Sequence, residues 1–307
     1  MEFPKTLQEF QTAFPDEEAC WDTLRQARWP DGFVCPRCGE PASSWISTRR
    51  LEQCRRCRYQ CSLTAGTVFH RTRLPLLTWF WAIFFVARHK QGISALQLQR
   101  DTGIGSYGTA WALLHRLRSA LCDRASAASR LSGLVEVDES YVGGPEPGRR
   151  GGREVLHKSI VAVAVEQRAH TAGRARLSVL HGVSLAKDLG PFIQANIDAK
   201  ATVRTDGMPA YYGLPAMGIR HDRQVQGYAA RSSEILPWAH TIFGNLKTWL
   251  RGTFHGVSGK HLPRYLDEFV YRFDRRWREG ELFGFVLRRA ARGEPLSYHR
   301  LVAEAAA

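Results

Sequence analysis

The sequence predicts an α/β domain that is preceded by a small cysteine-rich module and a helical region. Three observations lead to this prediction. Two Cys-x-x-Cys pairs stand between residues 35 and 57, apolar residues at helical spacing run through residues 74–122, and strand-like segments alternate with a helix between residues 134 and 205. Strands that alternate with helices are typical of α/β folds.

The composition is that of a folded and strongly basic protein. Of its 307 residues 44% are hydrophobic, and 43 Lys and Arg outnumber 29 Asp and Glu, which gives a net charge of +14. The length favours roughly two or three domains, and the positive charge favours a polyanion as partner. The apolar stretch Leu74–Val86 is too short to span a membrane, and the first residues lack the apolar segment of a secretory signal. We therefore expect neither a membrane protein nor a secreted one.

The cysteine spacing predicts a structural Zn²⁺ site. The pattern is C-x2-C-x15-C-x2-C, and its members are Cys35, Cys38, Cys54 and Cys57. Each Cys-x-x-Cys turn directs two thiolates at one point, and two such turns complete the tetrahedron that zinc prefers. Cys61, four residues further on, is either a fifth candidate ligand or a core residue, and we favour the core residue. Residues 1–65 are thus expected to form a helical lead and a zinc ribbon, whose surrounding arginines suit either nucleic acid or solvent.

Residues 66–125 are expected to be helical. The predicted helices are Leu74 to His89, Ser94 to Asp101 and Ser106 to Leu121. A short helix, a turn around Gly103 and a longer helix make a helix-turn-helix pattern, which is found in DNA-binding proteins and also in ordinary helical connectors. In the first interpretation Arg116 and Arg118 contact phosphates, and in the second they are surface residues.

The stretch Leu134–Gly144 is interpreted as a buried strand that carries a carboxylate. Asp138 lies mid-strand, where a buried charge costs on the order of several kcal/mol unless it is paired or bound to a metal. The alternative is an exposed edge position with an arginine partner. Asp206 lies at the end of a later strand. The order is β-β-β-α-β, with further strands at residues 159–165, 175–183 and 201–205 and a helix at 184–196.

Two more helices follow. Pro237 stands at the first position of a helix, Trp238 to Arg251, which Gly252 is expected to close. His240 and Lys247 are seven residues apart and therefore share one face, whereas Asn245 points elsewhere. A last long helix is predicted to begin at Ser258. Its core stripe has a period of 3.6 residues and comprises Leu262, Tyr265, Leu266, Phe269, Phe273 and Trp277.

Together these elements resemble the bacterial insertion-sequence transposases that have an N-terminal zinc ribbon and an RNase H-like DDE-type core. The resemblance covers about residues 15–280. It implies an RNase H-like catalytic domain with a mixed sheet over residues 132–285, a basic tail over 286–307, and a DNA-binding helix-turn-helix over 66–125. The phrases that carry it are Val137–Gly144, Thr205–Gly207, Asn245–Thr253, His255–Ser258, Lys260–Leu262 and Tyr265–Phe269.

The resemblance also implies a catalytic site in which carboxylates hold two divalent ions. Asp138 and Asp206 match the first two acids of the family and would bind Mg²⁺ or Mn²⁺. The third acid of such cores lies on a helix, seven residues before a basic residue. Lys247 fits the basic position, which places His240 where the third acid stands, and Asn245 is a second candidate.

A histidine at this position departs from the pattern of the family. Imidazole suits Mn²⁺ or softer ions better than Mg²⁺. It could instead contact phosphate, with Glu139 or Glu268 supplying the missing oxygen. Lys247 would bind a phosphate near the scissile bond, or be an ordinary surface lysine.

The function that the resemblance implies is that of a DNA transposase. Such an enzyme binds the terminal inverted repeats of its element and catalyses divalent-metal-dependent DNA cleavage and strand transfer. The implied partners are double-stranded DNA, as element ends and as target, and further copies of the chain in a homodimer or larger assembly. The implied location is the bacterial cytoplasm, at the nucleoid. The alternatives are a DNA-binding regulator derived from an inactive transposase and a zinc-ribbon RNA-processing nuclease.

Overall fold

The computed structural model describes residues 3–122, 130–143, 158–225 and 232–303. The chain divides into two compact units. The first unit comprises residues 1–121 together with 277–307, and the second comprises residues 122–276. The sequence led us to expect a boundary between residues 285 and 286 instead, so the observed division assigns the last helices to the first unit.

The first unit contains the predicted zinc ribbon. Its strands form an antiparallel sheet in the order β1-β2-β3, with bounds Ser43–Ile46, Leu51–Cys54 and Gln60–Ser62. Arg28 ties the preceding helix α2 (Glu17–Arg28) to the chain after β3, because its guanidinium donates to the carbonyls of Ser62 and Ala65. Cys61 is buried in this region.

Helices make up the rest of the first unit, and their ends follow the expected capping chemistry. Thr6 and Asp16 accept hydrogen bonds at the N-termini of α1 and α2, and Ser94 accepts one from the backbone N–H of Gln97, as its position predicts. Gly103, at φ +68°, ends α4. The remaining bounds are α1 Leu7–Ala13, α3 Leu76–Arg88, α4 Ala95–Thr102 and α5 Tyr107–Leu121.

The C-terminal segment of the first unit is not the basic tail that the sequence suggested. Helix α11 (Leu282–Arg292) buries an apolar face, and α12 (Tyr298–Ala303) follows it. The ring of Phe283 packs against Phe14 at a centroid distance of 5.6 Å. Trp277 is 78% exposed, so it does not continue the core stripe of the preceding helix α10 (Leu262–Asp274). The prediction missed that the apolar periodicity stops and restarts in a second helix.

The second unit is built on a five-stranded mixed sheet with the order β6-β5-β4-β7-β8. Strand β4 pairs antiparallel with β5 and parallel with β7, β6 pairs antiparallel with β5, and β8 pairs parallel with β7. The predicted order β-β-β-α-β is confirmed. The strand β8 was missed because its sequence Arg-His-Asp-Arg has no apolar residue. The bounds are β4 Leu134–Val142, β5 Ser159–Arg168, β6 Thr171–Leu180, β7 Thr202–Thr205 and β8 Arg220–Arg223.

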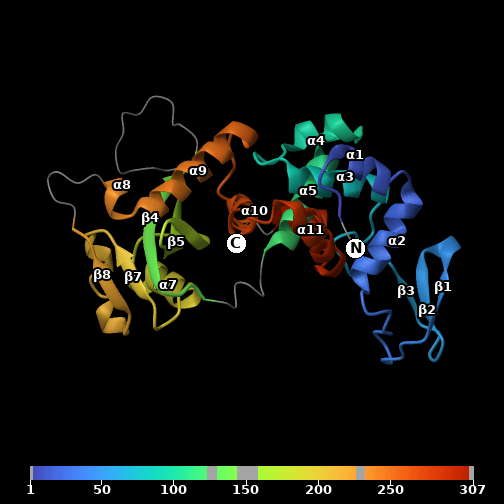
Figure 1. Cartoon of the computed structure of the whole chain (residues 1–307), viewed down its shortest axis with the longest axis horizontal. Coiled ribbons are helices and arrows are strands. Elements are labelled where there is room, and N and C mark those ends of the chain that lie inside the picture. Colours follow the sequence, from blue (N-terminus) through green and yellow to red (C-terminus); the bar gives the residue numbers. More distant parts are fainter. Residues whose placement is uncertain (1–2, 123–129, 144–157, 226–231, 304–307) are drawn as a thin grey trace. The chain divides into compact units, whose positions relative to one another are not determined.

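Helices cover both faces of this sheet, and α9 crosses β4 and β5 in Figure 1. One face packs against η2 (Leu185–Leu189) and α7 (Gly190–Asn196) through the side chains of Val135 and Val137. The opposite face packs against α9 (Pro237–Phe254) and α10 (Leu262–Asp274), with the short α8 (Ser232–Ile235) before them. The prediction that Gly252 closes α9 was wrong, since the helix continues to Phe254 and ends where His255 adopts φ +54°.

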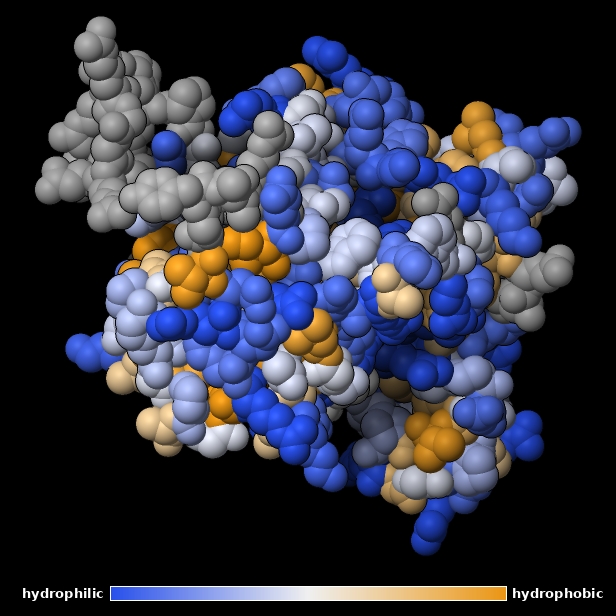
Figure 2. All heavy atoms as spheres, turned by 60° about the vertical axis from the view of Figure 1, so that its left-hand side comes forward, coloured by the Kyte–Doolittle hydropathy of each residue, from blue (hydrophilic) through white to orange (hydrophobic). Residues whose placement is uncertain are grey.

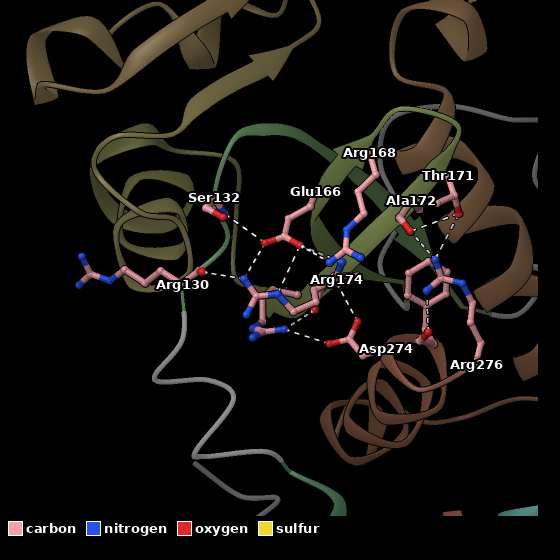
Figure 3. Close-up of polar contacts among 12 residues, drawn as sticks. Arg130, Ser132, Glu166, Arg168, Thr171, Ala172, Arg174, Asp274 and Arg276 are labelled. Atoms are coloured by element: carbon pink, nitrogen blue, oxygen red, sulfur yellow. Dashed lines mark hydrogen bonds and ion pairs between the residues drawn. The ribbon is translucent and has the colours of Figure 1, made fainter. Parts of the chain in front are cut away.

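The outer edge of β6 is held by residues at the end of α10 (Figure 3). Asp274 accepts a hydrogen bond from the backbone N–H of Ala175 at 2.9 Å, and the Arg276 guanidinium donates to the carbonyl of Ala172. These side chains satisfy two backbone groups that an edge strand would otherwise expose.

The surface is largely hydrophilic where Figure 2 shows it, with smaller orange patches of hydrophobic residues. Among the described residues, no helix combines the length and the apolar character that crossing a membrane requires.

Candidate functional site

The four predicted zinc ligands converge in the first unit. Their Sγ atoms all lie within 4.8 Å of one another. The Sγ atoms of Cys35 and Cys57 are 3.6 Å apart, as are those of Cys38 and Cys54. The backbone N–H of Cys57 donates toward Cys54 Sγ and lowers the pKa of that thiol to about 7. This favours the thiolate, which is the form that binds zinc.

Cys61 does not join this cluster, in agreement with the choice of a core residue. It is 7% exposed, and Arg28 Nη2 lies 3.9 Å from its Sγ. Burial raises the pKa of its thiol, which disfavours a thiolate ligand. Among residues 3–122, 130–143, 158–225 and 232–303, the four cysteines are the single group of three or more potential ligands whose atoms come this close.

The register of the sheet in the second unit brings Asp138 and Asp206 side by side. Glu136 of β4 stands opposite Arg204 of β7 in the parallel pair. Two residues further along both strands, Asp138 and Asp206 therefore face each other across neighbouring strands, which are about 4.8 Å apart. Consistent with this proximity, the charge of Asp206 raises the pKa of Asp138.

Asp138 lies on the sheet face that α9 covers. Alternation along β4 places it on the same side as Val142, which packs against α9 and α10. Its side chain is 15% exposed. Burial, first, and then the nearby Asp206 raise its pKa to about 7, although the backbone N–H of Glu139 and the charge of Lys247 oppose the shift. Among the described residues, no Lys or Arg side chain forms an ion pair with this carboxylate.

Helix α9 presents two of its three candidate residues to this carboxylate. His240 Nε2 lies 3.9 Å from Asp138 Oδ2. Lys247 Nζ donates to Ser140 Oγ at 2.7 Å, and Ser140 shares a sheet face with Asp138. Asn245 is exposed, and no contact joins it to either aspartate among the described residues.

Sequence reasoning missed Glu136, which fixes the start of α9. Its side chain is fully buried, and Oε2 accepts hydrogen bonds from the backbone N–H groups of Trp238 and Ala239, both at 2.9 Å. A carboxylate at a helix N-terminus is favoured by the free N–H groups and by the helix dipole. Because His240 is the next residue of α9, Glu136 positions it over β4. The signal available in the sequence was an acidic residue two positions before Asp138, on the same face of the strand.

Two rows of charged side chains cross the sheet on this face. In the first row Glu136, Arg204 and Asp222 stand in register on β4, β7 and β8, and Arg204 Nε binds Asp222 Oδ2 at 2.7 Å. The second row holds Asp138 and Asp206 and no basic residue of the sheet. The first row thus balances much of its own charge, whereas the second gathers negative charge.

The carboxylates considered as substitutes for a third acid are used elsewhere. Glu139 accepts a hydrogen bond from the hydroxyl of Tyr211, which packs in the core on the α7 face. Glu268 is 1% exposed and binds Arg272 at 2.9 Å. Glu139 nevertheless lies close enough to Asp138 and Asp206 that their charges, after burial, help to raise its pKa.

The arginines predicted as phosphate contacts on α5 do not lie on its surface. Arg118 is only 3% exposed, and Arg116 is half-buried, with a lowered guanidinium pKa caused by burial. The exposed part of α5 is its first turn, which includes Tyr107 and Thr109.

Two family models match the chain. The transposase zinc-ribbon domain matches residues 15–60. The ISXO2-like transposase domain matches residues 130–274. Together they span more than half of the sequence, in the order that the structure shows for the ribbon and the mixed sheet. The chain belongs to the insertion-sequence transposases.

One individual relative of this transposase matches over less than half of either chain. The transposase is 30% identical over 132 residues to an uncharacterized protein in transposable element ISH50 of Halobacterium salinarum. That match covers 42% of this chain and 43%, less than half, of the relative.

Solved structures of the Mos1 transposase are also similar to it. The paired-end complex with the left transposon end is 15% identical and matches 62% of this chain and 73% of that chain, with a TM-score of 0.28. The Mos1 strand transfer complex is 15% identical and matches 71% of this chain and 74% of that chain, with a TM-score of 0.30. TM-scores of this size do not establish a shared fold.

Proposed function

We propose that the chain is a DNA transposase that binds the terminal inverted repeats of its element and catalyses divalent-metal-dependent DNA cleavage and strand transfer. One observation carries the proposal. Asp138 and Asp206 stand side by side on neighbouring strands, in a domain matched by a transposase model, beneath a helix that brings His240 and Lys247 to the same face.

The proposed fold of the second unit is RNase H-like. Three antiparallel strands, a helix and a parallel strand on the other side of the first one agree with the order that the family resemblance implies. In this arrangement the first strand is central, so that its mid-strand residue Asp138 lies next to the end of β7.

We propose two kinds of metal site. Structural Zn²⁺ is held by the four cysteines, whose number, chemistry and convergence fit it. Mg²⁺ or Mn²⁺ is held by Asp138 and Asp206, whose oxygen donors suit hard divalent ions. Such ions activate the attacking water or hydroxyl and stabilise the leaving oxygen when bound. The adjacent aspartates supply the negative charge that attracts these ions, and ionised Asp138 is needed for their binding.

The remaining residues of the site act beside the aspartates. We assign the third position to His240, because it lies 3.9 Å from Asp138 while Asn245 is exposed. Lys247, fixed by Ser140, holds a phosphate of the substrate close to the aspartates. Glu136 keeps the start of α9 in place for both.

The first unit is the proposed reader of the element ends. The DNA-binding surface is formed by the zinc ribbon and by the helices α4 and α5. Its partner is double-stranded DNA, on which two or more copies of the chain assemble. We expect the chain to bind DNA in the cytoplasm. In a helix-turn-helix the first residues of the second helix contact base edges, and the exposed first turn of α5 fits this role better than Arg116 or Arg118.

Strand transfer by the full chain tests the proposal. Wild-type protein with Mg²⁺ or Mn²⁺ should cleave and join a duplex that carries the inverted repeat next to its gene. Asp138→Asn keeps the shape of the side chain but removes its charge, so we expect activity to fall at least about a thousandfold, while binding of the repeat persists. Near-normal strand transfer by Asp138→Asn would remove the core of the proposal.

A DNA-binding regulator is the second candidate. The histidine at the third position favours it, because a site with two carboxylates binds Mg²⁺ less well than one with three. Repeat binding without strand transfer in either metal would select the regulator.

A further inference from the structure

Two groups of basic residues in the second unit differ in their partners, and the first group is neutralised by carboxylates. Arg174 binds Glu166 at 2.6 Å, and Arg176 binds Asp274 at 3.2 Å with both side chains buried. Figure 3 shows Arg174 turned toward Glu166, and Arg276 turned toward the backbone of Ala172, at the edge of β6. Arg204 and Arg272 likewise have carboxylate partners. These guanidinium groups stabilise the fold, and their positive charge is already balanced within the protein.

The second group surrounds the C-terminal half of α9. It comprises Lys158, Lys247 and Arg251, and no ion pair joins any of them to a carboxylate within the described part of the chain. Arg251 is exposed, and Lys158 and Lys247 are partly buried. Burial lowers the pKa of Lys247, and the positive charges of Lys158 and Arg251 lower it further, against the influence of Asp138. Lys158 and Arg251 therefore each lie close enough to Lys247 for their charges to act on it.

Sequence and pairing explain why they gather there. Arg251 follows Lys247 by four residues, which is one helical turn, or about 6 Å along the axis. Lys158 directly precedes β5, whose Ser159 pairs with Val142 at the end of β4. Ser140, which accepts from Lys247 Nζ at 2.7 Å, lies two residues before that pair. The three cations thus lie beyond Asp138 in the direction of the end of β4.

The opposite direction along the sheet offers a poorer surface for an anion. The row of Glu136, Arg204 and Asp222 contains two carboxylates for one guanidinium, and that guanidinium is bound to Asp222. A polyanion beside Asp138 would meet negative charge on that side and unpaired positive charge on the other. A bound anion would also relieve the repulsion that Lys158 and Arg251 exert on Lys247.

We propose that Lys158, Lys247 and Arg251 form a phosphate-binding track that holds the backbone of the DNA strand adjoining Asp138, so that this strand runs along the C-terminal half of α9. The inference rests on the proposed function for the identity of the polyanion as DNA. It adds the path of the strand and two contact residues, Lys158 and Arg251, to that function.

Salt-dependent DNA binding by the full chain tests the track. The probe is a short fluorescein-labelled duplex of mixed sequence, and all variants carry Asp138→Asn so that the duplex stays intact. Lys158→Ala and Arg251→Ala should each weaken binding about three- to tenfold and reduce the slope of log K against log[KCl] by about 0.9, the value for one lost phosphate contact. Arg251→Lys keeps the charge and should keep the slope.

Lys200→Ala is the matched control. Lys200 is exposed in the same unit and precedes β7, whereas Asp206 follows β7, so the control removes the same charge at the far end of that strand. It should leave affinity and slope unchanged. Equal effects of Lys200→Ala and Arg251→Ala, or unchanged slopes in both track variants, would overturn the track. Neither result depends on catalysis, so a failure of the track and a failure of strand transfer by the wild-type chain are separate outcomes.

Discussion

The cysteine cluster of the first unit and the aspartate pair of the second draw their donors from different distances along the chain. The cysteines come from two local turns within residues 35–57, and their Sγ atoms converge within 4.8 Å. Asp138, Asp206 and His240 come from a strand, the end of another strand and a helix, and they do not form such a cluster in the described structure. The cysteine site is thus a local device that supports its own module, whereas the aspartate site exists only because a sheet and a helix have already assembled around it.

This difference also appears in the energetics of each site. Thiolates around a metal add to the folding energy of a small module. Two adjacent carboxylates in a half-buried setting do the opposite, since burial and mutual repulsion raise the pKa of Asp138 to about 7. Removing a cysteine should therefore destabilise the first unit, whereas removing an aspartate charge should stabilise the second unit.

The largest expected effect is at the cysteine cluster. Cys54→Ser should lower the zinc content from about one ion per chain to less than about half and cost the module roughly 10 kcal/mol of metal-linked folding energy. Metal analysis and limited proteolysis of the first unit measure both. Cys61→Ser is the control, because Cys61 lies outside the cluster and should keep its zinc. Unchanged zinc in Cys54→Ser would refute the four-thiolate site.

A smaller effect is expected at the third position of the aspartate site. His240→Ala should reduce strand transfer about a hundredfold, comparable to the loss of a residue that orders a metal ligand, while Asn245→Ala should change it less than about threefold. His240→Glu should keep activity with Mg²⁺, and the wild-type chain should prefer Mn²⁺ more than that variant does. Steady-state rates in the two metals measure this. A larger loss in Asn245→Ala would move the third position to Asn245.

The smallest effect concerns stability against pH. The pKa of Asp138 is about 7 in the folded chain and near its ordinary value of 3.8 when unfolded. A raised folded pKa contributes stability below about pH 4 that is lost as the pH rises through about 7. Without added Mg²⁺, Asp138→Asn should therefore gain about 2 kcal/mol relative to wild type between pH 5 and pH 7.

Urea unfolding at the two pH values measures this gain, with zinc left in place in both proteins. Glu139, whose pKa burial also raises to about 7, adds to the gain in the same direction, because the charge of Asp138 helps to raise that pKa and the variant removes it. A stability difference that does not vary with pH would show that Asp138 is not held in its neutral form.

Patterns of spacing and polarity made several features predictable. The cysteine spacing identified all four members of the cluster, since a short turn fixes the direction of its own side chains. The strand that carries Asp138 and the helix that carries His240 were found from β-branched residues and from Pro237. Where the pattern was polar, as in β8, or resumed after a break, as in α11, the prediction failed, because burial there depends on neighbours distant in the chain.

The sequence by itself determined which side chains can bind metal, the order of strands and helices, and the basic character of the chain. Only the tertiary structure decided that Glu136 is a helix-capping carboxylate, that Glu139 is turned toward Tyr211, and that Asp138 stands beside Asp206. The physical reason is that alternation along a strand fixes which residues share a face, while register between strands and the docking of α9 fix which of them meet. Register and docking are set by the packing of the whole core, and no local pattern encodes them.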